Sequence, residues 1–153
     1  MTASTQRRHL RYRPPQLFDL VADVERYPQF IPHVVDSQIR RRHDHSIVVD
    51  MTIAAGPIQK RFSTTAVLRR PYQIDIGSRD VIFDRFEQRW SFTPAAEGGT
   101  DVEYRVEFKF HSRILQKLMS AFFGDLAAST MAGFVHRAHR ICGSRAPGQE
   151  PVR

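Results

Sequence analysis

The sequence predicts an α+β fold in which a curved antiparallel sheet of about seven strands packs against one long C-terminal helix. From residue 113 to residue 142, apolar residues recur at steps of three and four without a proline, which is typical of an amphipathic helix. Most earlier segments alternate apolar and polar residues, as antiparallel strands with one buried face do. Because an amphipathic helix is not stable alone in water, we expect the sheet to cover its apolar side.

The apolar stripe of this helix changes face along its length. Large residues share one face in the first half: Leu115, Leu118, Phe122 and Leu126. Continued, the same face reaches Gly133, so either the helix bends near Gly124 or the side toward the sheet changes from large to small residues. Each internal glycine costs about 1 kcal/mol relative to alanine. A bend, a close approach or a cavity would explain these glycines, and a plain core helix that tolerates them is the alternative.

The segments before the helix follow a simple order. A weak strand is expected over 5–12, a short helix over 16–25 after two prolines, and a proline-pinned turn over 27–32. Strands are expected over 34–42, 46–54, 58–68, 72–77, 83–92 and 102–110, joined by short turns. Residues 1–143 then form a single domain, and the polar, proline-containing tail 144–153 is expected to be disordered.

Composition restricts the classes of function. The chain is 41% hydrophobic, which indicates a globular protein, and its single cysteine, Cys142, excludes an internal disulfide and a cysteine-based zinc site. We find no run of about 18 apolar residues and so expect no membrane span. The net charge of +7 favours anionic partners, either phospholipid surfaces or RNA.

The sequence predicts neither a catalytic site nor a metal site. The close histidine pairs, 43/45 and 136/139, lack an evident third ligand, and two aspartates four residues apart in the first helix are typical of a solvated face. We find no glycine-rich phosphate loop and no Ser/His/Asp pattern. The expectation is therefore a protein that is not an enzyme and holds no metal and no cofactor.

One stretch, residues 17–32 (LFDLVADVERYPQFIP), closely resembles the opening motif of the coenzyme Q-binding proteins. This family lies in the START-like, polyketide cyclase-related superfamily and includes the ribosome association toxin homologues. Weaker matches follow at Phe62-Ser63-Thr64-Thr65, Trp90-Ser91-Phe92 and Ser112-Arg113-Ile114-Leu115, so that the resemblance covers roughly residues 7–142. The chain departs from the family at one rim of the expected pocket, with Val81-Ile82 for Gly-Pro, Arg89 for glycine and His33 for tryptophan.

The resemblance implies a helix-grip fold with a hydrophobic cavity and ubiquinone, or a related lipid, as bound ligand. The candidate lining residues are Phe30, Phe62, Thr64, Gln88, Trp90, Leu115, Leu118 and Phe122. Trp90 could offer a flat face to a quinone ring or anchor the core, and Gln88 and Thr64 could bond a quinone carbonyl or else backbone or water.

The implied function is a lipid carrier or chaperone in respiration or quinone biosynthesis. The alternatives are a ribosome-associated inhibitor of translation, which would make the ribosome a partner, and a polyketide cyclase or aromatase.

A carrier of an apolar lipid is also expected to contact an anionic membrane surface. The residues assigned to that contact are Phe123, Arg113 and Lys117, because neighbouring residues of a helix diverge by about 100° and cannot all face the sheet. The expected location is the cytoplasm at the inner face of the membrane, or the mitochondrial matrix in a eukaryote. The sequence predicts no particular oligomeric state.

Overall fold

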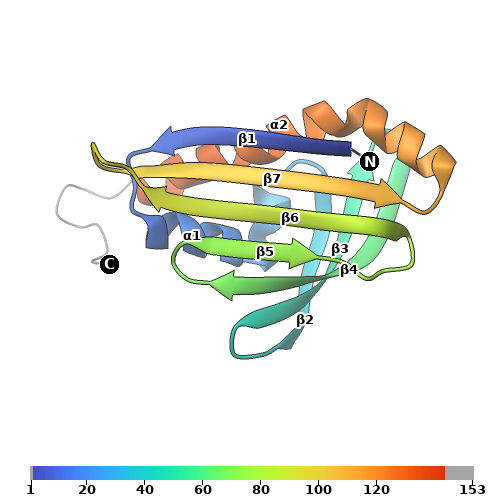
Figure 1. Ribbon diagram of the computed structural model, residues 1–153, viewed down its shortest axis with the longest axis horizontal. Coiled ribbons are helices and arrows are strands. Elements are labelled where there is room, and N and C mark those ends of the chain that lie inside the picture. Colours follow the sequence, from blue (N-terminus) through green and yellow to red (C-terminus); the bar gives the residue numbers. More distant parts are fainter. Residues whose placement is uncertain (1, 144–153) are drawn as a thin grey trace.

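The fold is one curved sheet with two helices on its concave face (Figure 1). The computed structural model describes residues 2–143. The strands are β1 (Thr2–Leu10), β2 (Val34–Arg42), β3 (Ser46–Ala55), β4 (Ile58–Arg69), β5 (Gln73–Gly77), β6 (Phe83–Pro94) and β7 (Thr100–Phe110). The helices are α1 (Pro14–Ala22), a 3₁₀ helix η1 (Val24–Gln29) and α2 (Arg113–Cys142). The predicted α+β, helix-grip architecture of seven strands and one long helix is confirmed.

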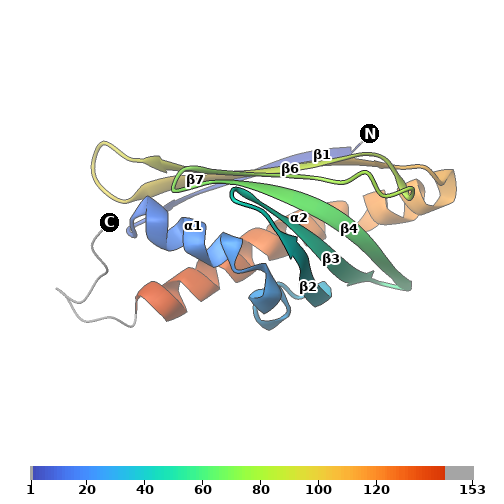
Figure 2. The same cartoon turned by 90° about the horizontal axis from the view of Figure 1, so that it is seen from below.

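Strands β2 to β7 form an antiparallel meander, and β1 pairs with β7 at the edge of the sheet opposite β2. The strand order is β1-β7-β6-β5-β4-β3-β2, and all neighbours are antiparallel. The β2–β4 end curls toward the helices, and α1 and α2 lie on the same side of the sheet (Figure 2). The curled end of the sheet and both helices therefore lie on the same, concave side of the molecule.

The first strand differs most from the sequence expectation. It spans Thr2–Leu10, where 5–12 was expected, and pairs with β7 from Thr2 opposite Phe108 to Leu10 opposite Thr100. Residues 2–6 carry little apolar alternation, so their extended form depends on pairing with β7, which the local sequence does not reveal.

The helix α1 begins where its prolines favour a first turn. The Gln16 side chain accepts a hydrogen bond from the Arg13 backbone N–H at 3.0 Å. The expected proline-pinned turn is the 3₁₀ helix η1, which contains Pro28, and its buried Tyr27 donates a hydrogen bond to the Val21 carbonyl. This bond fixes η1 against the end of α1.

The inward side of α2 is a single stripe of eight buried residues: Met119, Phe123, Ala127, Thr130, Met131, Phe134, Ala138 and Cys142. The stripe passes Gly124 without changing face, so the expected switch of face does not occur. The face that carries Leu118 and Phe122 was expected to meet the sheet, and this is wrong, because it lies on a flank of α2. At Gly133, farther along that flank, a Cβ atom would collide with the backbone carbonyl oxygen of Phe30. This flank of α2 therefore packs against the segment after η1 at Gly133.

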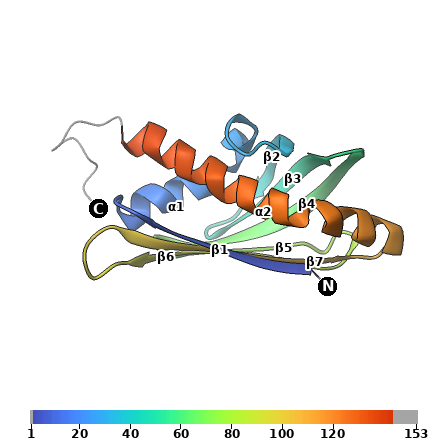
Figure 3. The ribbon, with the colours of Figure 1, turned by 90° about the horizontal axis from the view of Figure 1, so that it is seen from above.

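By length and composition, α2 could also cross a membrane, contrary to the expectation from the sequence. α2 lies along the sheet (Figure 3), and most of its inward stripe belongs to the hydrophobic core, as in a core helix. The first half nevertheless keeps large apolar side chains in solvent, with Ile114 76% and Leu118 41% exposed. Burial within the fold therefore explains only part of the apolar character of α2.

Candidate functional site

A cavity lies between α2 and the concave face of the sheet. The cavity volume is about 110 Å³, and its wall comes from η1, α2 and six of the strands. Most of the lining is apolar or aromatic, as in sites for small organic ligands.

The end of the cavity near the start of α2 is built from phenylalanines. Phe83 is the centre of this cluster, with ring centroids 5.2 Å from Phe62, 4.8 Å from Phe86 and 4.8 Å from Phe110. Phe123 of α2 packs edge-on against Phe108 of β7 at 4.8 Å. These rings give a wide apolar surface that suits a hydrocarbon chain.

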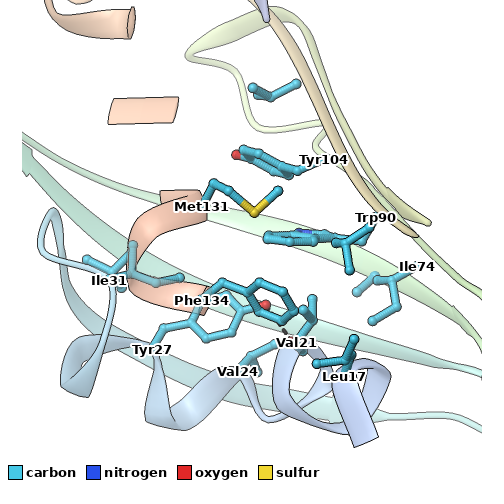
Figure 4. Close-up of a cluster of buried hydrophobic side chains, with 14 of the residues drawn as sticks. Leu17, Val21, Val24, Tyr27, Ile31, Ile74, Trp90, Tyr104, Met131 and Phe134 are labelled. Atoms are coloured by element: carbon cyan, nitrogen blue, oxygen red, sulfur yellow. Dashed lines mark hydrogen bonds between the residues drawn. The ribbon is translucent and has the colours of Figure 1, made fainter. Parts of the chain in front are cut away.

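The other end is built around Trp90 (Figure 4). Its ring lies 4.5 Å from Tyr104, the residue opposite it on β7, and 5.0 Å from Phe134 of α2. Trp90 is 3% exposed, so it serves both the core and the cavity wall. The two readings of Trp90 left open by the sequence are therefore compatible.

Polar side chains separate these two ends. On β6, Gln88 lies between Phe86 and Trp90, and on β4, Thr64 lies between Phe62 and Ala66. Besides Tyr27, whose hydroxyl donates to the Val21 carbonyl, three further polar groups line the cavity: His33, Tyr104 and Thr130. We call these five residues the polar belt, and they give the otherwise apolar cavity its hydrogen-bonding groups.

Hydrogen bonds fix one side of the polar belt. The Thr130 hydroxyl donates to the Leu126 carbonyl at 2.9 Å, and its oxygen lies 3.4 Å from Nε2 of His33. Nδ1 of His33 is buried without a hydrogen-bond partner among the described residues. Burial lowers the pKa of His33 to about 4, so its imidazole is neutral at physiological pH.

Burial also raises the pKa of the two tyrosines in the wall, Tyr27 and Tyr104. Both phenols therefore keep their protons and can act as hydrogen-bond donors. The cavity offers neutral polar groups to a ligand, and none of the described residues on its wall carries a carboxylate or an ammonium group.

Four of the eight residues predicted to line the cavity do so: Phe62, Thr64, Gln88 and Trp90. All four lie on strands, where the two-residue alternation identifies the inner face directly.

The other four do not line the cavity. For Leu115, Leu118 and Phe122 the prediction chose the wrong face of α2, and for Phe30 it chose the wrong side of the turn after η1. Leu115 is half-buried, Leu118 is exposed, and the Phe122 ring covers Gly56 in the β3–β4 turn. Phe30 lies outside the cavity wall, with the Arg137 guanidinium 5.4 Å from its ring centroid.

Of the three residues predicted to contact a membrane, two lie at the surface and one does not. Arg113 and Lys117 are exposed, but Phe123 is only 7% exposed and lines the cavity, so its expected surface position is wrong. Phe123 packs instead on β7, against Phe108.

Sequence reasoning missed His33, Tyr104 and Thr130 as cavity residues. Tyr104 could have been found from the alternation of β7, which places it on the same face as Phe108. Thr130 is the polar residue within the buried stripe of α2, and the sequence does not reveal this once the stripe is assigned to the wrong face. His33 carried only one signal, its place where relatives often have tryptophan.

Few titratable side chains of the described residues line the cavity. Within residues 2–143 no group of three or more histidine, cysteine or carboxylate side chains could hold a metal ion. The titratable side chains on the cavity wall are His33, Tyr27 and Tyr104, and His33 bonds neither tyrosine. The arrangement is suited to holding a neutral, mostly apolar molecule with a few polar atoms.

Comparison with known proteins agrees with this geometry. Residues 10–135 match the model of the family described as polyketide cyclase / dehydrase and lipid transport. The chain belongs to this family. The match confirms the START-like, coenzyme Q-binding relationship that the motif at residues 17–32 indicated.

Two family relatives cover nearly the whole chain. The ribosome association toxin RatA of Vibrio cholerae is 30% identical over 128 residues, 84% of this chain and 89% of its own length. The mitochondrial coenzyme Q-binding protein coq10 of Schizosaccharomyces pombe is 28% identical over 138 residues, 86% of this chain and 83% of its own length.

Solved structures share the fold at lower identity. A START superfamily protein from Mycobacterium smegmatis has a TM-score of 0.76 at 15% identity and covers 91% of this chain and 98% of its own. The Zhui aromatase/cyclase from Streptomyces sp. R1128 has a TM-score of 0.82 at 12% identity and covers 96% and 98%. At these identities the likeness establishes the fold and leaves the chemistry to the residues of the cavity.

Proposed function

We propose that the protein binds ubiquinone or a related isoprenoid quinone in this cavity, as a carrier or chaperone in respiration or quinone biosynthesis. The observation that carries the proposal is the polar belt between two aromatic ends of one cavity. An isoprenoid quinone has the matching pattern, a polar ring joined to a long hydrocarbon tail. The 28% identity with a coenzyme Q-binding protein supports the same ligand class.

The geometry suggests one orientation for the ligand. The quinone ring lies beside Trp90, where offset stacking contributes about 0.5–1.5 kcal/mol. The amide of Gln88 and the hydroxyl of Thr64 make no hydrogen bond to the described residues, and both can donate to an oxygen on the ring. The isoprenoid tail then extends along the phenylalanines near Phe83.

The test is extraction of lipid from the purified protein. The protein is produced in a ubiquinone-making cell, purified, extracted with organic solvent and compared with a control protein of similar size. We expect quinone in the wild-type extract and less in a Gln88→Leu, Thr64→Val double variant, which keeps the volume of the cavity. If no quinone or other lipid exceeds the control, and none binds on addition, the proposal fails.

The same cavity supports a binding role better than catalysis. A cyclase would need a positioned acid and base within reach of its substrate. On this wall, a pKa of about 4 makes His33 a weak base, and the raised pKa of Tyr104 makes its phenol a weak acid. We therefore propose that the protein acts without catalysing a reaction, and conversion of an added polyketide substrate by the pure protein would refute this.

The exposed start of α2 is the surface we assign to membrane contact. Ile114 and Leu118 lie one turn apart in solvent, flanked by Arg113 and Lys117. Val81, 89% exposed, belongs to the β5–β6 loop, whose Ile82 carbonyl accepts a 2.8 Å hydrogen bond from His111 just before α2. Apolar side chains beside cations suit an anionic bilayer, where each nearby cation contributes about 1 kcal/mol.

Vesicle flotation tests this contact and the location it implies, the cytoplasmic face of the membrane or the matrix face in a eukaryote. Wild type should float with anionic vesicles at low salt, and the Ile114→Ser, Leu118→Ser double variant should float less. Val35→Ser is the matched control, because Val35 is 50% exposed on β2, near the middle of α2, where His33 contacts Thr130, and not at its start. Equal flotation of wild type and the double variant would remove this face from the proposal.

Ribosome binding is the second candidate function. It is favoured by the 30% identity with a ribosome association toxin and by the net charge of +7. Arg41 and Arg42 at the end of β2 form no salt bridge with the described residues and could contact phosphate. Sedimentation of lysate tests this: co-migration with ribosomes that falls steeply with salt supports the role, and no co-migration at low salt excludes it.

A further inference from the structure

His33 presents an unsatisfied hydrogen-bonding atom within the cavity wall. It follows Pro32 in the segment between η1 and β2 and lines the cavity, and its Nδ1 is buried without a partner among the described residues. Buried polar atoms are nearly always paired, because leaving one unpaired costs the free energy of removing it from water. A ligand able to pair with Nδ1 would remove that cost.

The neighbouring hydrogen bonds determine which kind of partner Nδ1 requires. The Thr130 hydroxyl has one proton, which it donates to the Leu126 carbonyl at 2.9 Å. Its oxygen can therefore only accept from Nε2 of His33, 3.4 Å away. Nε2 thus carries the imidazole proton, and Nδ1 carries the lone pair. Burial lowers the pKa of His33, with no charged side chain contributing, so Nδ1 remains an acceptor at physiological pH.

A donor lies in the same part of the cavity. Burial raises the pKa of the Tyr104 phenol, which keeps its proton, and this side chain approaches Thr130 closely enough to interact with it. Figure 4 shows the Tyr104 oxygen directed from the sheet toward α2. The His33 imidazole and the Tyr104 phenol are therefore both neighbours of Thr130.

We propose that the cavity selects a ring that carries a free hydroxyl group, the hydroquinone or phenol form of an isoprenoid lipid, over the fully oxidised quinone. A ring hydroxyl can donate to Nδ1 of His33 and accept from Tyr104, whereas a quinone carbonyl can only accept and leaves Nδ1 unpaired. This inference rests on the proposed function and adds the redox form of the ligand. The protein would then serve the steps that consume or deliver the reduced lipid.

The test compares the two redox forms of one soluble probe. Decylubiquinone and its chemically reduced hydroquinone are titrated anaerobically against the protein. Quenching of Trp90, the single tryptophan of the chain, reports binding, and equilibrium dialysis checks it. Because one buried acceptor is paired in only one complex, we expect the hydroquinone to bind roughly tenfold tighter or more.

Variants of His33 show whether this residue causes the preference. His33→Phe removes the acceptor and should bring the affinity ratio close to one, while His33→Asn keeps an acceptor near the position of Nδ1 and should retain most of the ratio. His136→Phe is the matched control, since His136 is exposed on α2 and should leave the ratio unchanged. Melting curves confirm that each variant is folded.

The outcomes separate this inference from the function on which it rests. Equal binding of both forms by wild type, or an unchanged ratio in folded His33→Phe, would overturn the selection while leaving quinone binding in place. Failure of wild type to bind either form would overturn the proposed function itself, and the selection with it.

Discussion

Two glycines of α2 provide a matched pair of substitutions with opposite expected effects. Gly133→Ala would place a Cβ atom against the backbone carbonyl oxygen of Phe30, whereas a Cβ at Gly124 would meet nothing within 4 Å. Both residues lie inside the same helix, so the gain in helix propensity, about 1 kcal/mol, is shared by the two variants. Their difference therefore measures the close approach of α2 to the segment after η1.

The expected magnitudes follow from this contact. Gly124→Ala should raise the free energy of unfolding by about 0.5–1 kcal/mol. Gly133→Ala gains the same amount but must displace backbone, and overpacking of this kind costs about 1–3 kcal/mol. For a chain of this size, 1 kcal/mol corresponds to about 2–4 °C in Tm. The Tm of Gly133→Ala should therefore lie several degrees below that of Gly124→Ala.

The assay is thermal or urea unfolding of wild type and both variants, with quinone titration of each. Displacement of α2 at residue 133 would also shift the wall near Ile31 and Thr130, so Gly133→Ala should bind the ligand more weakly while Gly124→Ala binds as wild type. Equal stability of the two variants would refute the reasoning, because it would mean that α2 and the Phe30 carbonyl are not in contact.

Three further predictions concern single residues of the cavity. Trp90→Phe keeps most of the buried volume and should weaken quinone binding severalfold, measured by titration, through loss of stacking; unchanged affinity in the folded variant would remove Trp90 from the site. Phe123→Ser should unfold the protein or lower its free energy of unfolding by about 3 kcal/mol or more. Leu118→Ser should change the free energy of unfolding by less than about 0.5 kcal/mol. Similar losses for the two variants in urea titrations would contradict the assigned faces of α2. The pKa of His33 is about 4 in the folded protein and about 6.5 in the unfolded chain, so between these pH values the unfolded chain binds one more proton. The free energy of unfolding therefore falls as the pH drops from 6.5 to 4, by at most about 3 kcal/mol. His33→Phe should flatten this part of a stability–pH curve, and a curve parallel to that of wild type would show that His33 is not buried as described.

The sequence by itself determined the order and type of nearly all the elements. Strict alternation in β6 and β7 identified the inner face, because successive strand side chains point to opposite sides whatever the strand packs against. It therefore placed Gln88 and Trp90 correctly on the cavity wall. The bounds of α2, Arg113–Cys142, also followed from periodicity and from the absence of proline.

Tertiary structure alone decided how α2 is rotated about its axis. The helix is apolar on more than one side, so local periodicity permits several orientations, and Phe122 and Phe123 are equally hydrophobic. The contact of Gly133 with the Phe30 backbone and the packing of Phe123 on Phe108 select one of them. The same rotation brings Thr130 beside His33, two residues 97 positions apart. The polar belt is therefore a product of packing between distant segments, which no pattern within either segment encodes.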